Sequence, residues 1–265
     1  LFLYDPNKRT FKLMYEDPDY DVAGPVGGCR TAAGGASIDE KTNELTYVSY
    51  YAEEPVRIFF DEEAEKTNAI LANAFPEEIV RPVTWSKDRN KVVVSVSSSS
   101  NPGDYYYFDK ENMILTFLWD SSPWIDRSKL AKKQAIKYTA RDGLVVHGYL
   151  TIPAGTDGKN LPMVVHPHGG PNARDTMSYD PYVQFMANRG YVVFQPNFRG
   201  STGYGAYHYI SANKQFGKTM QDDITDGVNY LIELGIADRD RIAIFGGSYG
   251  GYATMAGLAF TPDLY

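Results

Sequence analysis

The stretch Gly246-Gly247-Ser248-Tyr249-Gly250 carries the strongest local signal in this sequence. The apolar run Arg241–Phe245 precedes it and indicates a buried strand, and a helical pattern over Tyr249–Phe260 follows it. A serine between a strand and a helix, with small residues two places before and two places after it, is typical of a nucleophile elbow. The alternative is a glycine-rich turn that contains a serine by chance. The flanking strand and helix favour the elbow, with Ser248 as the attacking nucleophile on a strained backbone.

Two backbone N–H groups are candidates for stabilising the oxyanion that would form opposite this serine. The first belongs to Tyr249, at the start of the helix that follows the nucleophile. The second should come from a loop after an earlier strand, and His166-Pro167-His168-Gly169-Gly170-Pro171 stands in such a place. Its two glycines let the backbone approach a substrate carbonyl, so we expect the N–H of Gly169 to be the second donor. An ordinary Gly-Gly-Pro turn is the alternative.

Strands alternate with helices from residue 136 onwards. Asp-Gly at the turn 141–143 predicts an opening hairpin, and Thr219 with Asp222 predicts a capping box at the start of a later helix. The expected strands are Ile136–Ala140, Leu144–Ile152, Met163–Val165, Tyr191–Gln195 and Arg241–Phe245, and the expected helices are Tyr182–Asn188, Asp222–Leu234 and Tyr249–Phe260. This order predicts a mostly parallel sheet with helices on both faces. With the elbow, it indicates an incomplete α/β-hydrolase domain over residues 126–265.

Residues 1–120 contain a loose internal repeat. Asp5, Asp61 and Asp109 each follow a short apolar or aromatic run, and we expect all three at equivalent turns. Ala36-Ser37-Ile38-Asp39 and Trp85-Ser86-Lys87-Asp88 each lead into an expected strand. Turns and strands that recur about every 50 residues are typical of four-stranded β-propeller blades. We therefore predict part of a propeller, about two to three blades, over residues 1–125, with a β-sandwich as the alternative.

Composition and charge argue against several classes of partner. The 265 residues carry a formal net charge of −7, which argues against nucleic acid or an anionic membrane as the main partner. No apolar run approaches the ~18 residues of a membrane span, and Cys29 has no second cysteine for an internal disulfide. The sequence opens at Leu1 without a Met and stops soon after a helix. We expect further sequence of the same protein on both sides.

Other polar residues are better explained by structure than by chemistry. His166 and His168 could form a metal pair, but no nearby His or Cys completes a ligand set. In α/β-hydrolases the triad runs in the order Ser, Asp or Glu, His, so a histidine before the nucleophile is misplaced as the base. Asp222 and Asp223 could suggest paired acid catalysis, but carboxylates in a first helical turn are explained by the helix dipole.

Three glycine-rich segments together resemble the prolyl oligopeptidase family. They are His168-Gly169-Gly170-Pro171, Asn197-Phe198-Arg199-Gly200-Ser201-Thr202-Gly203-Tyr204-Gly205 and Gly246-Gly247-Ser248-Tyr249-Gly250-Gly251. The resemblance is specific over residues 136–260, weaker over 1–125, and strongest to acylaminoacyl peptidases and bacterial dipeptidyl peptidases. It implies a propeller that caps the hydrolase domain and admits only short or unstructured peptides.

The resemblance also implies roles for single residues. Ser248 corresponds to the family's nucleophile, and Gly169 and Tyr249 correspond to its oxyanion donors. The family places its catalytic Asp and His well after the nucleophile, so both would lie outside residues 1–265. A chain without them is expected to be inactive alone, because a serine hydroxyl needs an adjacent base.

The resulting hypothesis is a serine peptidase that hydrolyses short peptides through an acyl-enzyme on Ser248. It would be of the dipeptidyl-, acylaminoacyl- or oligopeptidase type, without a metal or organic cofactor, and its oligomeric state stays open. One alternative is a carboxylesterase of the same fold, which shares the acyl-enzyme chemistry. Another is a non-catalytic interaction module built on a propeller.

Overall fold

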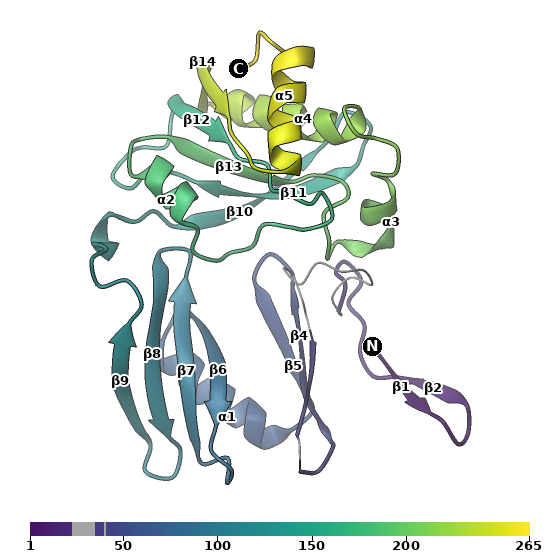
Figure 1. Ribbon diagram of the computed structural model, residues 1–265, viewed down its shortest axis with the longest axis vertical. Helices are drawn as coiled ribbons and strands as arrows, with labels where there is room; N and C mark the ends of the chain where they lie inside the picture. The colour runs from purple at the N-terminus through teal and green to yellow at the C-terminus, as the bar shows by residue number, and fades with distance from the viewer. Residues whose placement is uncertain (23–34, 40) are drawn as a thin grey trace.

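The computed structural model describes residues 1–22, 35–39 and 41–265 (Figure 1). Narrow antiparallel sheets from the N-terminal part of the chain lie below a five-stranded sheet from the C-terminal part. Helices α4 and α5 lie above this larger sheet, and α2 lies on the side that faces the N-terminal sheets (Figure 1). None of the helices in the described ranges is both long enough and apolar enough to cross a membrane.

The larger sheet is mixed, with the strand order β10-β11-β13-β12-β14. Its strands are β10 (Lys133–Thr139), β11 (Val145–Thr151), β12 (Leu161–Val165), β13 (Val192–Asn197) and β14 (Ala237–Ile244). The first three in this order run antiparallel, and β13, β12 and β14 run parallel. The five strands expected from the apolar pattern are confirmed, although β14 begins four residues earlier than expected.

Helices cover both faces because β13 carries apolar side chains on both. Val192 and Phe194 belong to the larger core on the α4 side, whereas Val193 packs with Val183 of α2 on the other side. The helices of this part are α2 (Pro181–Ala187), α3 (Gly205–Ile210), α4 (Thr219–Glu233) and α5 (Tyr249–Phe260). A strand that is buried on both faces in this way is typical of parallel sheets between helical layers.

The expected capping box of α4 is wrong. The helix begins at Thr219 with Lys218 as its N-cap, and no side chain caps it. Thr219 is therefore already helical, whereas a capping residue needs a non-helical backbone. Its hydroxyl donates to Gln215 Oε1 at 3.2 Å, and the Asp222 carboxylate accepts from Arg141 at 2.9 Å. Gly235 follows the C-cap Leu234 and has the left-handed φ of 69°, which is typical of the residue that ends a helix.

The described residues of the N-terminal part form three antiparallel sheets of different size. They are the pair β1 (Phe2–Asp5) and β2 (Thr10–Leu13), the triplet β3 (Gly35–Ile38), β4 (Leu45–Tyr51) and β5 (Pro55–Phe59), and the quartet β6 (Ile79–Trp85), β7 (Lys91–Ser98), β8 (Asn101–Asp109) and β9 (Ile114–Asp120). Within residues 1–22, 35–39 and 41–125, only the last sheet shows the four strands expected of each repeat. The strands expected after Asp39 and Asp88 are confirmed as β4 and β7.

The expected equivalence of Asp5, Asp61 and Asp109 is only partly right. Asp5 and Asp109 each end the first strand of a hairpin and accept hydrogen bonds from backbone N–H groups of the turn. Asp61 instead caps helix α1 (Glu62–Ala74), where its carboxylate accepts from the N–H of Ala64 at 2.7 Å. The same short acceptor side chain suits a turn and a helix start. The repeat therefore fails where the glutamate- and alanine-rich segment after Asp61 favours a helix.

One turn of the N-terminal part is bound tightly to the larger sheet. The Arg174 guanidinium donates to the carbonyl oxygens of Tyr51 and Ala52 at 3.0 and 2.7 Å. The Tyr149 hydroxyl donates to the Glu53 carbonyl at 2.7 Å, and the Glu53 carboxylate lies 2.9 Å from Lys137 Nζ. Most of these contacts are made to backbone carbonyls of the β4–β5 turn.

Gly227→Ala tests the packing of α4 on the sheet. An added Cβ would lie 2.5 Å from Phe194 Cζ and 2.7 Å from Tyr138 Cζ, and both rings are buried. Overpacking costs about 1–3 kcal/mol, and better helix propensity returns about 1 kcal/mol. Because two buried rings would both lie closer than 3.0 Å, we take the upper part of the overpacking range and expect the free energy of unfolding in urea to fall by about 1–2 kcal/mol. Asn229→Ala on the same helix is the control, with an expected change within about 0.5 kcal/mol. An unchanged Gly227→Ala protein would contradict the packing.

His208 of α3 predicts a loss of stability in mild acid. The side chain is 4% exposed, and burial lowers its pKa to about 4. Between that pKa and the ordinary value near 6.5, the unfolded chain binds a proton that the folded chain does not bind. The stabilising contribution is therefore complete above pH 6.5 and decreases as the pH falls towards 4, by about 3 kcal/mol in total.

Urea unfolding at pH 8 and pH 5 measures this effect. His208→Gln should show a clearly smaller loss between the two pH values, because glutamine keeps an N–H donor for the Phe198 carbonyl but does not titrate. Burial also lowers the pKa of His147 and of His168, so part of the pH dependence should remain. An identical loss in the variant and the unmodified protein would contradict the assignment to His208.

Candidate active site

Ser248 occupies a sharp turn between β14 and α5. It is exposed and has φ 56° and ψ −121°, a conformation that residues with a side chain rarely adopt. A Cβ on Gly246 would lie 2.7 Å from the carbonyl carbon of Gly250, and a Cβ on Gly250 would overlap the carbonyl oxygen of Pro167. Both positions therefore require glycine. The local geometry expected of a nucleophile elbow is present, and the role of Ser248 remains a prediction.

The loop after β12 lies against Ser248. Strands β12 and β14 are parallel neighbours, with Val165 opposite Ile244. The segments that follow these two strands therefore leave the sheet at the same edge. A Cβ built on Gly169 would be 3.4 Å from Ser248 Cβ and 3.9 Å from its Oγ. Among the described residues, no hydrogen bond is made by the N–H of Gly169 or by that of Tyr249. These two groups are thus near the serine and available to a ligand.

His168 is bound within the loop and does not reach towards Ser248. Its Nδ1 lies 2.7 Å from the Gly169 carbonyl oxygen, and its Nε2 lies 2.8 Å from Ser201 Oγ. The Nδ1 atom must carry a proton, because a carbonyl oxygen can only accept. Burial lowers the pKa of His168, which favours the neutral ring with its proton on Nδ1. The ring also stacks on Phe198, with centroids 4.5 Å apart.

The remaining histidines also have partners other than Ser248. His166 Nδ1 lies 2.7 Å from the Phe245 carbonyl oxygen, His147 Nδ1 lies 3.2 Å from Glu53, and His208 Nε2 lies 3.1 Å from the Phe198 carbonyl oxygen. Within the described ranges, no histidine is hydrogen-bonded to the serine, and no group of three or more His, Cys, Asp or Glu side chains could hold a metal ion.

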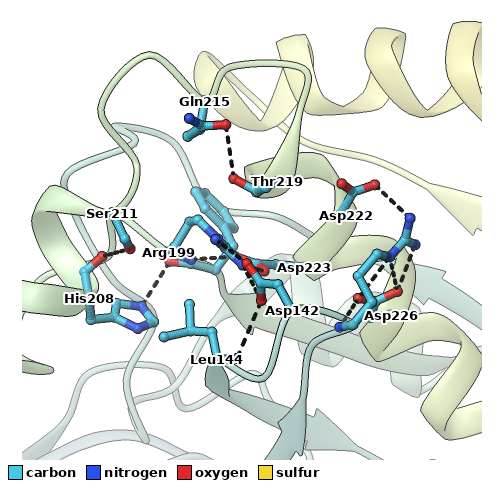
Figure 2. A network of polar contacts seen from close by, with 12 residues as sticks. Asp142, Leu144, Arg199, His208, Ser211, Gln215, Thr219, Asp222, Asp223 and Asp226 are labelled. Carbon is cyan, nitrogen blue, oxygen red and sulfur yellow. Dashed lines mark hydrogen bonds and ion pairs between the residues drawn. The ribbon is translucent and has the colours of Figure 1, made fainter.

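A buried ion-pair network lies behind the site and was not predicted (Figure 2). Asp223 is fully buried and accepts from Arg199 at 2.8 and 2.6 Å, and Asp142 accepts from the same guanidinium at 2.7 and 3.0 Å. Burial raises the pKa of the Asp223 carboxyl, whereas the bonds from Arg199 act in the opposite direction. The two carboxylates raise the pKa of Arg199. The helix-dipole interpretation of Asp223 is therefore incomplete, since its main partner is this arginine.

The fold is shared with part of several solved enzymes. A puromycin-hydrolyzing peptidase of Mycobacterium tuberculosis has a TM-score of 0.73 and 25% identity, and the match covers 97% of this chain and 39% of that one. A puromycin hydrolase has a TM-score of 0.75 and 23% identity, and the match covers the whole of this chain and 39% of that one. The chain thus corresponds to about two fifths of each of these larger proteins.

Relatives of known sequence are peptidases by name. Dipeptidyl aminopeptidase BIII of Pseudoxanthomonas mexicana is 35% identical over 277 aligned positions, which cover all of this chain and 38% of that protein. Dipeptidyl peptidase family member 6 of Caenorhabditis elegans is 32% identical over 89% of this chain and 35% of that protein. The chain therefore spans less than two fifths of the length of either relative.

A family model matches the last third of the chain. Residues 177–265, which include α2 to α5 and the turn at Ser248, match the model of the prolyl oligopeptidase family. The expected resemblance is thereby confirmed, and the chain belongs to the prolyl oligopeptidase family.

Proposed function

We propose that this chain carries the nucleophile region of a serine peptidase that acts on short peptides. Residues 126–265 would be the first part of an α/β-hydrolase domain, and residues 1–125 part of a β-propeller that precedes it. The observation that supports the proposal most directly is the strained turn at Ser248 with the Gly169 loop against it. Relatives named as dipeptidyl aminopeptidase and acylamino-acid-releasing enzyme favour peptides as the substrates.

In the proposed reaction, Ser248 Oγ attacks the carbonyl carbon of the scissile peptide bond. The N–H groups of Tyr249 and Gly169 donate to the oxyanion of the tetrahedral intermediate. A general base takes the Ser248 hydroxyl proton and passes it to the leaving amine, and an acyl-enzyme remains on Ser248 until water, activated by the same base, hydrolyses it. Losing one such oxyanion donor costs on the order of 3 kcal/mol of transition-state stabilisation, so the position of the Gly169 loop is important.

The base and the carboxylate that orients it would come from outside residues 1–265. The four histidines of the sequence all precede Ser248, and each is bound to another group. A serine hydroxyl without an adjacent base is a weak nucleophile. Residues 1–265 alone would therefore turn substrate over extremely slowly.

Ser248→Ala in the natural-length protein tests the proposal. Turnover of a panel of aminoacyl and dipeptidyl chromogenic amides should fall by up to about a millionfold in kcat, because the covalent step is lost. Ser178→Ala, an exposed serine, is the control and should keep full activity. Residues 1–265 expressed alone should show no measurable turnover.

Four outcomes would contradict parts of the proposal. Full amide cleavage by Ser248→Ala would exclude this serine as the nucleophile. Robust cleavage by residues 1–265 alone would mean that the base lies within them. Cleavage of short-chain esters but of no amide by the natural-length protein would favour a carboxylesterase, and no cleavage of either would favour a non-catalytic module.

A further inference from the structure

The turn formed by residues 198–201 connects two parts of the molecule that the proposed mechanism leaves unconnected. It follows β13, and it lies between the first turn of α4 and the loop that carries Gly169. None of its residues is assigned a role in the reaction above. Its polar side chains, Arg199 and Ser201, are nevertheless buried, which is costly unless each is hydrogen-bonded, as both are.

Arg199 fixes one side of this turn (Figure 2). Its side chain is 5% exposed, and both its backbone N–H and its Nε donate to Asp223 Oδ2, at 2.9 and 2.8 Å. Its Nη2 donates to Asp223 Oδ1 at 2.6 Å. A bond from the backbone N–H sets the position of the main chain as well as that of the side chain. Bidentate arginine–carboxylate pairs of this kind have strong geometric preferences.

The backbone of the turn has little freedom to move. The N–H of Gly200 donates to the His208 carbonyl at 2.9 Å, and Gly200 adopts a φ of 94°. A Cβ at Gly200 would lie 2.7 Å from Ala212 Cβ. Phe198 is fully buried, and its ring lies near both His168 and Tyr249, with centroid distances of 4.5 and 5.2 Å.

The other side of the turn holds the Gly169 loop. Ser201 is fully buried, and its hydroxyl lies 2.8 Å from His168 Nε2 and 2.7 Å from the Phe198 carbonyl oxygen, so its single proton is shared between these two acceptors. His168 Nδ1 donates to the Gly169 carbonyl at 2.7 Å. Asn172 Nδ2 donates to the Gly200 carbonyl at 2.9 Å, further along the same loop. A continuous path of short polar contacts therefore runs from Asp223 through the turn to Gly169, which lies against Ser248.

We propose that Arg199 and Ser201 are positioning residues for the oxyanion site, and that Asp223 acts through Arg199. This inference rests on the proposed function, because it assigns the Gly169 N–H to the oxyanion. Arg199 holds the turn against α4, and the Ser201 hydroxyl in the turn fixes the orientation of the His168 ring. The ring then holds the Gly169 carbonyl, and with it the residue whose N–H donates to the oxyanion of the transition state.

A donor that stabilises only the transition state should affect kcat more than KM. Loss of an oxyanion donor lowers kcat by about 10²–10³-fold, and a displacement of about 1 Å can cost about 10²-fold. Removing the Ser201 hydroxyl leaves His168 Nε2 without its partner and frees the ring to turn. For Ser201→Ala we therefore expect kcat to fall about 10- to 100-fold with KM changed less than about threefold.

The experiment compares three variants of the natural-length enzyme on one chromogenic peptide amide. Ser201→Ala and Arg199→Lys should both lower kcat selectively, because lysine cannot reproduce the bidentate pair. Arg141→Lys is the matched control. Arg141 also pairs with two carboxylates of α4, Asp222 and Asp226, but it is 53% exposed in its side chain and does not contact the 198–201 turn. Its kcat and KM should equal those of the unmodified enzyme.

Active-site titration separates positioning from a merely structural role. The loss of kcat is calculated per titrated site, so a variant that is only partly folded does not imitate the effect. A selective loss of kcat per site in Ser201→Ala, with a normal Arg141→Lys, supports the inference. An unchanged kcat per site in Ser201→Ala, or a fall explained entirely by fewer sites, overturns it while leaving the peptidase proposal intact. No amide cleavage by the unmodified enzyme would overturn both.

Discussion

The close contact between the first turn of α5 and the end of β12 constrains the whole site. At Gly250 there is no room for a side chain, because the carbonyl oxygen of Pro167 occupies the place of a Cβ. With glycine at position 250, the helix can approach the end of β12 more closely than it could with any residue that carries a side chain. This approach brings Ser248 and the Gly169 loop to the same edge of the sheet, although about eighty residues of chain separate them. Without it, the Gly169 loop would not lie beside the strained serine.

Arg141 and Arg199 each pair with carboxylates of α4. Comparing them shows how burial changes the contribution of an ion pair to stability. Arg141 binds Asp222 and Asp226 at the surface, where such pairs contribute about 0–1 kcal/mol each. Arg199 binds the fully buried Asp223, and removing one partner of a buried pair typically costs 3–5 kcal/mol, because the other charge is left uncompensated. Buried pairs are not efficient sources of stability compared with apolar packing. Their geometric demands agree better with a positioning role.

The parts of the structure that could be predicted are those encoded over a few residues. The strand before Ser248, the helix after it and the apolar strands of the larger sheet follow from local periodicity, and the structure confirms them. The pairing of Arg199 with Asp223 joins two elements across the fold, so no local pattern indicates it. The capping box expected at the start of α4 and the turn expected at Asp61 are wrong for a related reason. A short polar side chain can cap a helix, close a turn or lie inside a helix, and only the backbone conformation distinguishes these. The roles of Ser248, Gly169 and Tyr249 remain predictions.

The attachment of the β4–β5 turn to the larger sheet has a consequence for how sequence variation should be interpreted. Arg174 recognises the carbonyl oxygens of Tyr51 and Ala52, which every amino acid supplies, rather than their side chains. Substitutions at these two positions can therefore accumulate in related proteins without breaking the attachment. An insertion or deletion of one residue in the turn would move both carbonyls at once. Family members should accordingly tolerate different residues here while keeping the length of the turn, and a search for conserved side chains would overlook the contact.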